Sequence, residues 1–377
     1  MSIVAKSRRP RFTNIHLGFI VDQCFARVPG GTARYTRELG AALARTSGPR
    51  DQVTGWCGWS ADLSPGAIDG MLGPHRLALP RVALARAWAA GAGPVPRNCD
   101  VVHAPTLLAP PRRRRPLVVT IHDAVPWTHP ETLTAHGGDW HRTMARRAQR
   151  ADAIVVPTRA VADALGSVIS PRRIEVVALG PTEALLIAPA DAGARRASLA
   201  LPAEYAIVVA TAEPRKGLDV ALDAWAESSP LPLAVVGPRG WGEFDLSAEV
   251  KRRGLSSAVL PLGQLDDVDL AAALHGATMM VAPSRAEGFG LPVLEAMAAG
   301  IPVVLSDDPA QVEVAGGSGV VVPIGDASAL AAAVAHLYAS PEARAAGSTG
   351  GLARAKAFSW DGAATSLWAL YRELASQ

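Results

Sequence analysis

The sequence predicts an α/β protein built from two Rossmann-like domains, each with a parallel sheet. Short apolar runs alternate with alanine-rich amphipathic stretches, the pattern of parallel strands covered by helices. Proline, glycine and small residues interrupt this pattern near Ala178–Ala200, after which it starts again. The chain has 377 residues, enough for two domains that each bury a core. We therefore place domain one at residues 1–180 and domain two at residues 181–360.

The elements of each domain follow from these runs in chain order. In domain one we expect strands at Ile15–Val21, Val101–His103, Leu117–Ile121 and Ile154–Val156, and helices at Thr32–Arg45, at Asp139–Arg150 and from Ala160 onward. In domain two we expect a helix at Leu218–Glu227 and strands at Tyr205–Ala210, Leu233–Val236, Ser257–Leu260, Met279–Ala282, Pro302–Leu305 and Gly319–Val322.

Composition places the chain among globular proteins of a reducing compartment. Hydrophobic residues make up 49% and charged residues 19%, which excludes a disordered chain. The three cysteines, Cys24, Cys57 and Cys99, lack metal-type or redox spacing and are expected to be buried thiols. No apolar segment follows the basic start, so we expect no signal peptide. No window holds the roughly 18 uninterrupted apolar residues of a spanning helix. We expect a cytoplasmic protein.

Charge is divided unevenly between the two halves. Residues 1–180 contain 24 Lys and Arg against 12 Asp and Glu, a net charge of +12, and the remainder carries −9. The basic half could face an anionic acceptor or associate with an anionic membrane surface, and an arginine-rich surface without a partner is the equal alternative. The run Arg112–Arg115 is read most simply as a solvated loop. No nucleic-acid-binding motif accompanies the charge, so we expect no nucleic acid partner.

The segment from Glu287 to Glu295 combines two carboxylates, a glycine-rich turn and a predicted helix start. Gly288 and Gly290 lack a Cβ and so let the backbone approach a ligand closely. The first N–H groups of the helix have no internal partner and can hold a phosphate. Eight residues at 100° each return nearly to the same helix face, so the two acids can meet two ends of one ligand. A diphosphate with a sugar at one end and a ribose at the other fits this arrangement.

Arg215 and Lys216 follow the predicted strand at Tyr205–Ala210, at the sheet edge where open α/β folds bind ligands. Two cations here could neutralise a diphosphate and stabilise it as a leaving group without a metal ion. No Asp-x-Asp pair is placed to hold Mg²⁺ on such a group. Glu213 could orient Arg215. An isolated Arg–Lys pair is more often plain surface charge, but the nearby carboxylate pair favours the functional interpretation.

Two further segments follow strands in domain one. Gly30 and Gly31 lie in a loop before a helix that Thr32 could cap, and they do not form a dinucleotide-binding fingerprint. His122 and Asp123 end the strand at Leu117–Ile121. Alone, a His–Asp dipeptide is more often a satisfied structural pair, and in this setting an active-site role is favoured, with Asp123 fixing the tautomer or contacting acceptor.

Taken together, these segments resemble glycosyltransferase family 4, a family of retaining glycosyltransferases with the GT-B fold. Four motifs stand in the family's order: Pro29–Tyr35, Thr120–Asp123, Ala212–Gly217 and Glu287–Glu295. The resemblance extends from about Ile15 to about Tyr371. It implies that the two sheets face each other across a cleft. It also implies that domain one receives the acceptor and that the C-terminal helix, residues 361–377, packs back on that domain.

The resemblance also implies the chemistry. It is a front-face transfer in which the departing phosphate takes the acceptor proton, with no metal and no cofactor. The residues implied in catalysis are His122, Glu287, Arg215 and Lys216. The residues implied in donor binding are Gly30, Gly31, Gly263, Gly288, Phe289, Gly290, Leu291 and Glu295. The donor would be a nucleotide-sugar, with GDP-mannose favoured over a UDP-sugar, and the acceptor a glycan or lipid-linked glycan.

Some positions depart from the family pattern. Arg285 and Ala286 precede the first glutamate where an aromatic residue is common, and His275 stands where Tyr is frequent. Because of these departures, the sequence does not decide which sugar and which nucleotide base the donor carries. His136, His141 and Arg142 could line the acceptor side or be exposed on a helix. Two other functions stay open: a nucleotide-sugar epimerase or hydrolase of the same fold, and a non-catalytic nucleotide-sugar-binding subunit.

Overall fold

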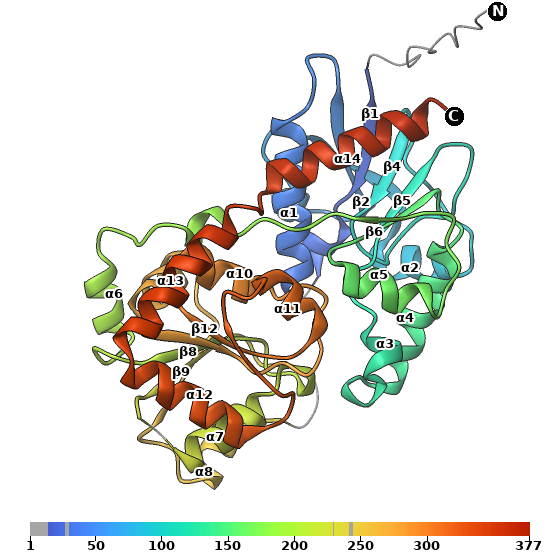
Figure 1. The fold of residues 1–377 in the computed structure, drawn as a ribbon. Helices are drawn as coiled ribbons and strands as arrows, with labels where there is room; N and C mark the ends of the chain where they lie inside the picture. The colour runs from blue at the N-terminus through green and yellow to red at the C-terminus, as the bar shows by residue number, and fades with distance from the viewer. Residues whose placement is uncertain (1–13, 27–29, 229, 241–243) are drawn as a thin grey trace, which may run out of the picture.

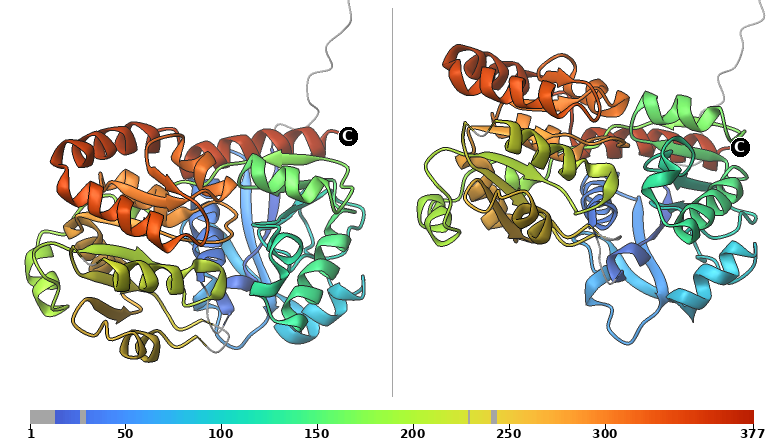
Figure 2. Two further views of the ribbon diagram at one scale, coloured as in Figure 1. Left: turned by 60° about the horizontal axis from the view of Figure 1, so that its bottom comes forward. Right: turned by 90° about the horizontal axis from the view of Figure 1, so that it is seen from below.

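The computed structural model describes residues 14–26, 30–228, 230–240 and 244–377. They form two α/β domains that lie side by side, each with helices packed on both faces of a central sheet (Figures 1 and 2). All strand pairs in both sheets are parallel. The predicted α/β class with two Rossmann-like domains is confirmed.

Domain one contains the first sheet, in the order β3-β2-β1-β4-β5-β6-β7. Its strands are β1 (His16–Ile20), β2 (Gln52–Trp59), β3 (Leu72–Pro80), β4 (Val101–Ala104), β5 (Leu117–Thr120), β6 (Ala153–Val156) and β7 (Ile174–Val176). Its helices are α1 (Gly30–Arg45), α2 (Arg81–Ala89), α3 (Val125–Thr128), α4 (Ala135–Ala148) and α5 (Arg159–Gly166), with 3₁₀ turns η1 (Asp22–Phe25), η2 (Ser64–Gly66) and η3 (Pro130–Thr132).

Domain two contains the second sheet, in the order β10-β9-β8-β11-β12-β13. Its strands are β8 (Ala206–Val209), β9 (Leu233–Val236), β10 (Val259–Gly263), β11 (Met279–Ala282), β12 (Val303–Ser306) and β13 (Val320–Val322). Its helices are α6 (Ala192–Ser198), α7 (Leu218–Glu227), α8 (Leu246–Arg252), α9 (Asp267–Gly276), α10 (Leu291–Ala298), α11 (Pro309–Ala315), α12 (Ala327–Ala339) and α13 (Pro341–Ala355), with 3₁₀ turns η4 (Glu183–Leu185) and η5 (Pro214–Lys216).

Several boundaries differ from the sequence-based expectation for local reasons. Helix α1 begins at Gly30, so Thr32 lies within its first turn and is not the cap that we predicted. Helix α4 begins four residues earlier than expected because the Thr134 hydroxyl caps it, accepting a bond from the Gly137 N–H at 3.1 Å. Strand β10 begins at Val259 and extends to Gly263, later than the predicted Ser257–Leu260.

The final helix, α14 (Trp360–Ala375), crosses back from domain two and packs against α1 (Figure 1). The Trp368 indole N–H donates to the Leu43 carbonyl at 3.1 Å, and the Tyr371 hydroxyl contacts His103 Nδ1 at 2.6 Å. The chain therefore joins the two domains twice, once between β7 and β8 and once between α13 and α14. Within the described ranges, no helix has both the length and the apolar character needed to cross a bilayer.

The domains also touch where their sheets face each other. Glu313 on α11 accepts hydrogen bonds from the N–H groups of Arg159 at 2.9 Å and Ala160 at 3.0 Å, at the start of α5. On α1, Arg34 pairs with Asp267 at the start of α9, at 2.5 Å. These contacts hold the carboxyl ends of both sheets together, where ligands bind in folds of this kind.

Candidate active site

The two predicted glutamates lie around the start of helix α10, directly after β11. Gly290 precedes the helix in the left-handed region, with φ of 87° and ψ of 48°, a conformation that favours glycine. Pro292 stands in the first turn, where its missing N–H costs nothing and its fixed φ suits a helix. The chain therefore turns sharply into α10. This places Glu287 in the turn before the helix and Glu295 about one turn into it.

Glu287 is the centre of a compact cluster of charges. Its Oε1 accepts hydrogen bonds from Lys216 Nζ at 2.5 Å and from the Ser284 hydroxyl at 2.8 Å. Its Oε2 accepts one from Arg215 Nη1 at 3.0 Å. Arg215 Nε in turn donates to Glu213 Oε2 at 2.9 Å. Two cations and two carboxylates thus form one buried network, and charge-assisted bonds of this kind hold their members in a defined geometry.

Electrostatics fix the charge state of this cluster. Burial favours a neutral Glu287, but Lys216 and Arg215 outweigh burial and lower the pKa of the carboxyl to about 2. Burial and the neighbouring Arg215 both lower the pKa of Lys216, while Glu287 opposes that change. The pKa of Glu213 is raised, chiefly by burial. Glu287 is therefore an anion at neutral pH and cannot serve there as a proton donor.

Both cations keep donor groups that could meet a ligand. Lys216 uses one of its three N–H bonds on Glu287, and Arg215 Nη2 makes no hydrogen bond to any described residue. The η5 turn that carries them ends at Gly217, with φ of 64°. A Cβ there would lie 2.0 Å from the Pro283 carbonyl oxygen. Only glycine lets this turn pack so closely on the loop that leads to Glu287.

Glu295 is buried and already has partners. Its Oε1 accepts a hydrogen bond from the Thr182 hydroxyl at 2.6 Å and lies 3.6 Å from Arg34 Nη1. Burial raises the pKa of this carboxyl, and Arg34 partly offsets the rise. The sequence-based expectation was a carboxylate facing a ribose. In this structure Glu295 Oε1 instead contacts Thr182, in the segment between the domains, and Arg34 on helix α1.

Gly288 lies at a close contact between the two domains. A Cβ at this position would lie 1.7 Å from the carbonyl oxygen of His122 in domain one. The Gly288 carbonyl accepts a hydrogen bond at 3.0 Å from the hydroxyl of Thr158, which also caps helix α5. We predicted that this glycine makes room for a ligand. In this structure the space is taken by the backbone of domain one.

His122 is oriented by the chain around it. Its Nε2 must donate to the Pro105 carbonyl at 2.8 Å, so a neutral ring presents Nδ1 as an acceptor. Burial lowers the pKa of the imidazole, and its ring makes a T-shaped contact with the Tyr35 ring, with centroids 4.5 Å apart. Asp123 does not set the tautomer, because its Oδ1 accepts from the Val125 N–H at 3.1 Å. The tautomer is set by the Pro105 carbonyl, a backbone contact that no sequence pattern predicts.

The remaining predicted donor-binding residues differ in what surrounds them. Gly30, Gly31 and Gly263 face open space, since a Cβ at any of them would have no neighbour within 4 Å. Leu291 begins α10, so its N–H and those before it have no helical partner. Phe289 is different: its side chain is buried against Phe358, with ring centroids 5.8 Å apart. Only its backbone N–H is therefore a candidate for ligand contact.

The side chains at two positions that depart from the family pattern, Arg285 and His275, contact other parts of the protein. Arg285 pairs with Asp219 at 2.6 Å, and His275 Nε2 contacts the Leu185 carbonyl at 3.0 Å. His141 contacts the Gly137 carbonyl through Nδ1 at 2.7 Å. Arg142 donates to the Pro126 carbonyl at 2.7 Å and pairs with Asp139 on its own helix. The side chains of His141 and Arg142 thus make contacts within α4 and between α4 and α3. His136 is exposed at the start of the same helix.

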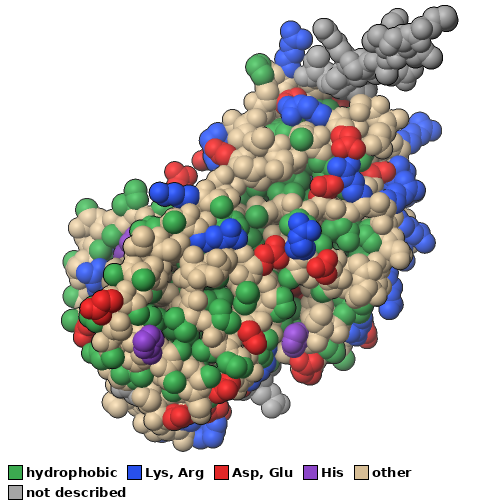
Figure 3. Space-filling view, in the orientation of Figure 1, with side chains coloured by type: hydrophobic (Ala, Val, Ile, Leu, Met, Phe, Trp, Pro, Cys, Tyr) green, Lys and Arg blue, Asp and Glu red, His purple; other side chains and the backbone are tan. Residues whose placement is uncertain are grey.

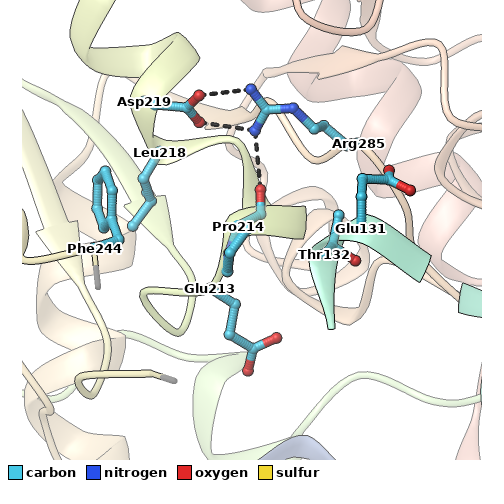
Figure 4. A pocket seen from close by; sticks show the side chains of 8 residues that line it. All are labelled: Glu131, Thr132, Glu213, Pro214, Leu218, Asp219, Phe244 and Arg285. Atoms are coloured by element: carbon cyan, nitrogen blue, oxygen red, sulfur yellow. Dashed lines mark hydrogen bonds and ion pairs between the residues drawn. The ribbon is translucent and has the colours of Figure 1, made fainter. Parts of the chain in front are cut away.

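A pocket of about 310 Å³ adjoins the cluster, between η3 of domain one and the η5 turn of domain two (Figure 4). Phe244 and Leu218 lie on one side of it and Glu131 and Thr132 on the other, with the Asp219–Arg285 ion pair nearby. Sequence patterns did not single out Glu131, Thr132 or Phe244. Their relevance comes only from the folding of distant segments around one space.

Two parallel-sheet domains, with a charged site at their facing edges and a helix that returns to the first domain, define the GT-B class. Two family models match successive parts of the chain: "Glycosyltransferase Family 4" over residues 29–180 and "Glycosyl transferases group 1" over residues 194–351. The chain belongs to glycosyltransferase family 4.

Individual relatives agree with this assignment. The chain is 36% identical over 176 residues to O-antigen chain mannosyltransferase B of Escherichia coli, covering 45% of this chain and 46% of that one. It is 35% identical over 213 residues to D-inositol 3-phosphate glycosyltransferase of Segniliparus rotundus, covering 54% and 47%. In these comparisons the chain spans about half the length of the relatives. Sucrose-phosphate synthase from Thermosynechococcus elongatus superposes with a TM-score of 0.74 at 25% identity, covering 96% and 99%.

Proposed function

We propose that this protein is a retaining glycosyltransferase that moves a sugar from a nucleotide-sugar to a glycan or lipid-linked glycan acceptor. The observation that carries the proposal is the network of Arg215, Lys216 and Glu287 beside the start of helix α10. Cationic side chains and unpartnered helix N–H groups suit a diphosphate. A buried, ionised carboxylate next to them suits the hydroxyl groups and the developing positive charge of a sugar.

Donor binding would redistribute the charges of this network. In the structure Glu287 balances the cations, and a diphosphate would take over that balance through the N–H groups of Arg215 and Lys216 that have no partner among the described residues. Glu287 would then turn toward the transferred sugar. In the proposed reaction the bond from the anomeric carbon to the phosphate oxygen breaks. The acceptor oxygen bonds to the same face of that carbon, and its proton passes to the departing phosphate.

GDP-mannose is the favoured donor and a UDP-sugar is the alternative. The mannosyltransferase among the relatives supports mannose, while the inositol phosphate glycosyltransferase leaves other hexoses open. We also propose that the reaction needs no metal ion, because two side-chain cations already face the leaving group. The basic first domain would bring the enzyme to anionic acceptors or to an anionic membrane surface.

The proposal is tested by incubating the protein with GDP-mannose or UDP-glucose and a panel of glycan acceptors, with and without EDTA. We expect transfer with one donor family, an unchanged rate in EDTA, and a product that keeps the donor's anomeric configuration by NMR. Release of free sugar without transfer would favour a hydrolase, and a changed sugar on the nucleotide an epimerase. Donor binding with no turnover would favour a non-catalytic subunit. Strict dependence on added Mg²⁺ would refute the metal-free part.

A further inference from the structure

A second pocket, of about 230 Å³, lies in domain one, away from the proposed transfer site. It is bounded by the end of α2, the end of α4 and the segment that leads into β5. Leu117 is the first residue of β5 and Ala151 precedes β6, so the pocket opens at the amino ends of these strands. His122 follows the carboxyl end of β5. The two sites therefore lie at opposite edges of the same sheet.

The pocket has an apolar base and a basic rim. Trp88, Leu117 and Met144 are buried at its base. Four arginines and no acidic residue are among its lining residues; the arginines are Arg112, Arg113, Arg147 and Arg150. Lys and Arg side chains also gather along this edge of domain one, at the right in Figure 3. The site is thus a cavity of one charge sign, which favours an anionic ligand.

Among the residues that the structure describes, protein partners pair with only one of these four arginines. Arg112 is bound to Asp152 through three hydrogen bonds. Arg113, Arg147 and Arg150 form no ion pair with any described residue. The Nε atom of Arg147 is fully buried and donates no hydrogen bond to the described part of the chain. A buried guanidinium N–H without an acceptor is costly, so this atom is suited to a ligand oxygen.

The ordinary explanation for arginines here is the end of helix α4, where cations are stabilised by the carbonyl groups of the last turn. That explanation covers Arg146 and Arg147 but not the pocket. Arg113 comes from a different segment, before β5, and Arg150 lies beyond the helix. Nor does it account for a buried Nε that lacks an acceptor. Convergence of arginines from two segments on one cavity is the feature that favours a ligand.

We propose that this pocket binds an organic phosphate: a phosphate group held by Arg113, Arg147 and Arg150, with its apolar substituent on the Trp88–Met144 base. Planar guanidinium groups match phosphate oxygens in geometry as well as charge. The ligand is either a free phosphorylated metabolite or the headgroup of an anionic lipid, because both present the same chemistry. The site is independent of the proposed transfer reaction.

The test compares the full-length protein with Arg147→Gln and Arg150→Gln, using phenyl phosphate and inorganic phosphate as free probes in ³¹P NMR titrations. We expect phenyl phosphate to bind more tightly than inorganic phosphate and each substitution to weaken binding at least tenfold. Arg150 is exposed, so its variant keeps a measurement available should Arg147→Gln fail to fold. The matched control is Arg146→Gln, an exposed neighbour that does not line the pocket, which should change binding less than twofold.

A second arm uses phosphatidylglycerol and phosphatidylcholine vesicles in sedimentation assays at constant salt. Pocket-dependent binding to phosphatidylglycerol alone would identify a lipid headgroup, and binding of phenyl phosphate alone a soluble metabolite. Equal losses in Arg146→Gln and Arg147→Gln would show diffuse charge attraction and overturn the proposal. Absence of binding in both arms would overturn it as well. Donor binding should be unchanged in all variants, so failure here leaves the proposed transferase function standing.

Discussion

Gly288 and His122 belong to different domains, yet a Cβ on the first would lie 1.7 Å from the carbonyl oxygen of the second. The loop that carries Glu287 is therefore seated directly on domain one. This contact makes the geometry of the charged cluster depend on how closely the domains approach. Because real atoms never come so near, one added methyl group must move either the loop or a whole domain.

Gly288→Ala should reduce sugar transfer at least about tenfold, since small displacements of positioned groups cost rate on this scale or more. The loss should appear in kcat/KM, with a modest change in melting temperature. Gly193→Ala is the control, because a Cβ there meets no neighbour and alanine favours its helix. Equal activity of Gly288→Ala and the wild type would show that the domains need not approach this closely during catalysis.

Glu287→Ala and Lys216→Ala should each lower transfer by at least about 100-fold, the scale of losing a contact to the transition state. Each substitution removes one partner of the 2.5 Å pair and leaves the other charge without it. Lys251→Ala, an exposed lysine on α8, should retain full activity. Steady-state rates of sugar transfer measure these effects. Near-normal rates in both site variants would show that the reaction takes place elsewhere in the protein.

Glu287→Gln should destabilise the protein in a pH-dependent way. The folded-state pKa of Glu287 is about 2, below its ordinary value of 4.5, so ionisation stabilises the fold above pH 4.5. That stabilisation is lost as the pH falls from 4.5 toward 2. The difference in unfolding free energy between wild type and variant should be on the order of 3 kcal/mol at pH 7 and shrink below pH 4.5. Urea unfolding at several pH values measures it, and a constant difference would exclude the charge as its origin.

Thr158→Ala should lower both stability and transfer. The Thr158 hydroxyl caps helix α5 and also donates to the Gly288 carbonyl at 3.0 Å. Loss of the cap should cost about 1 kcal/mol, and loss of the second bond should loosen the loop that carries Glu287. Thr134→Ala removes a comparable cap on α4 that has no such bond to domain two. Thr134→Ala should therefore lose stability and keep its rate, and parallel rate losses in both variants would contradict this division.

The strands with strong apolar runs were predicted from the sequence, and strands without such runs were missed. Strands β2 and β3 were not expected, because glycine and polar residues interrupt β2 and only Pro74 and Leu77 are buried in β3. Strand β3 pairs only with β2, at the edge of the sheet, where proline is tolerated. Edge strands need few buried side chains, so their sequences carry little periodic signal.

The candidate site was predictable where its residues are close in sequence. Glu287 and Glu295 share one turn and helix, and Arg215 and Lys216 share one loop, so spacing was informative. The bond between Thr182 and Glu295 joins residues 113 positions apart. No local pattern marks such a pair, because it depends on where the segment between the domains comes to lie. The same holds for the four arginines of the second pocket, which come as two pairs from two segments that are distant in sequence.

The return of α14 to domain one gives the molecule two tethers between its halves. Two domains joined by one linker can rotate relative to each other in many directions. Two linkers restrict this rotation to a single hinge axis that passes through both of them. Motion between the domains should then be a swing that opens and shuts the shared cleft. A further consequence concerns where the chain is vulnerable. Removal of α14 would expose the surface of domain one that this helix covers, although domain one is formed by the first half of the sequence. The sheet of domain two would stay covered by its own helices.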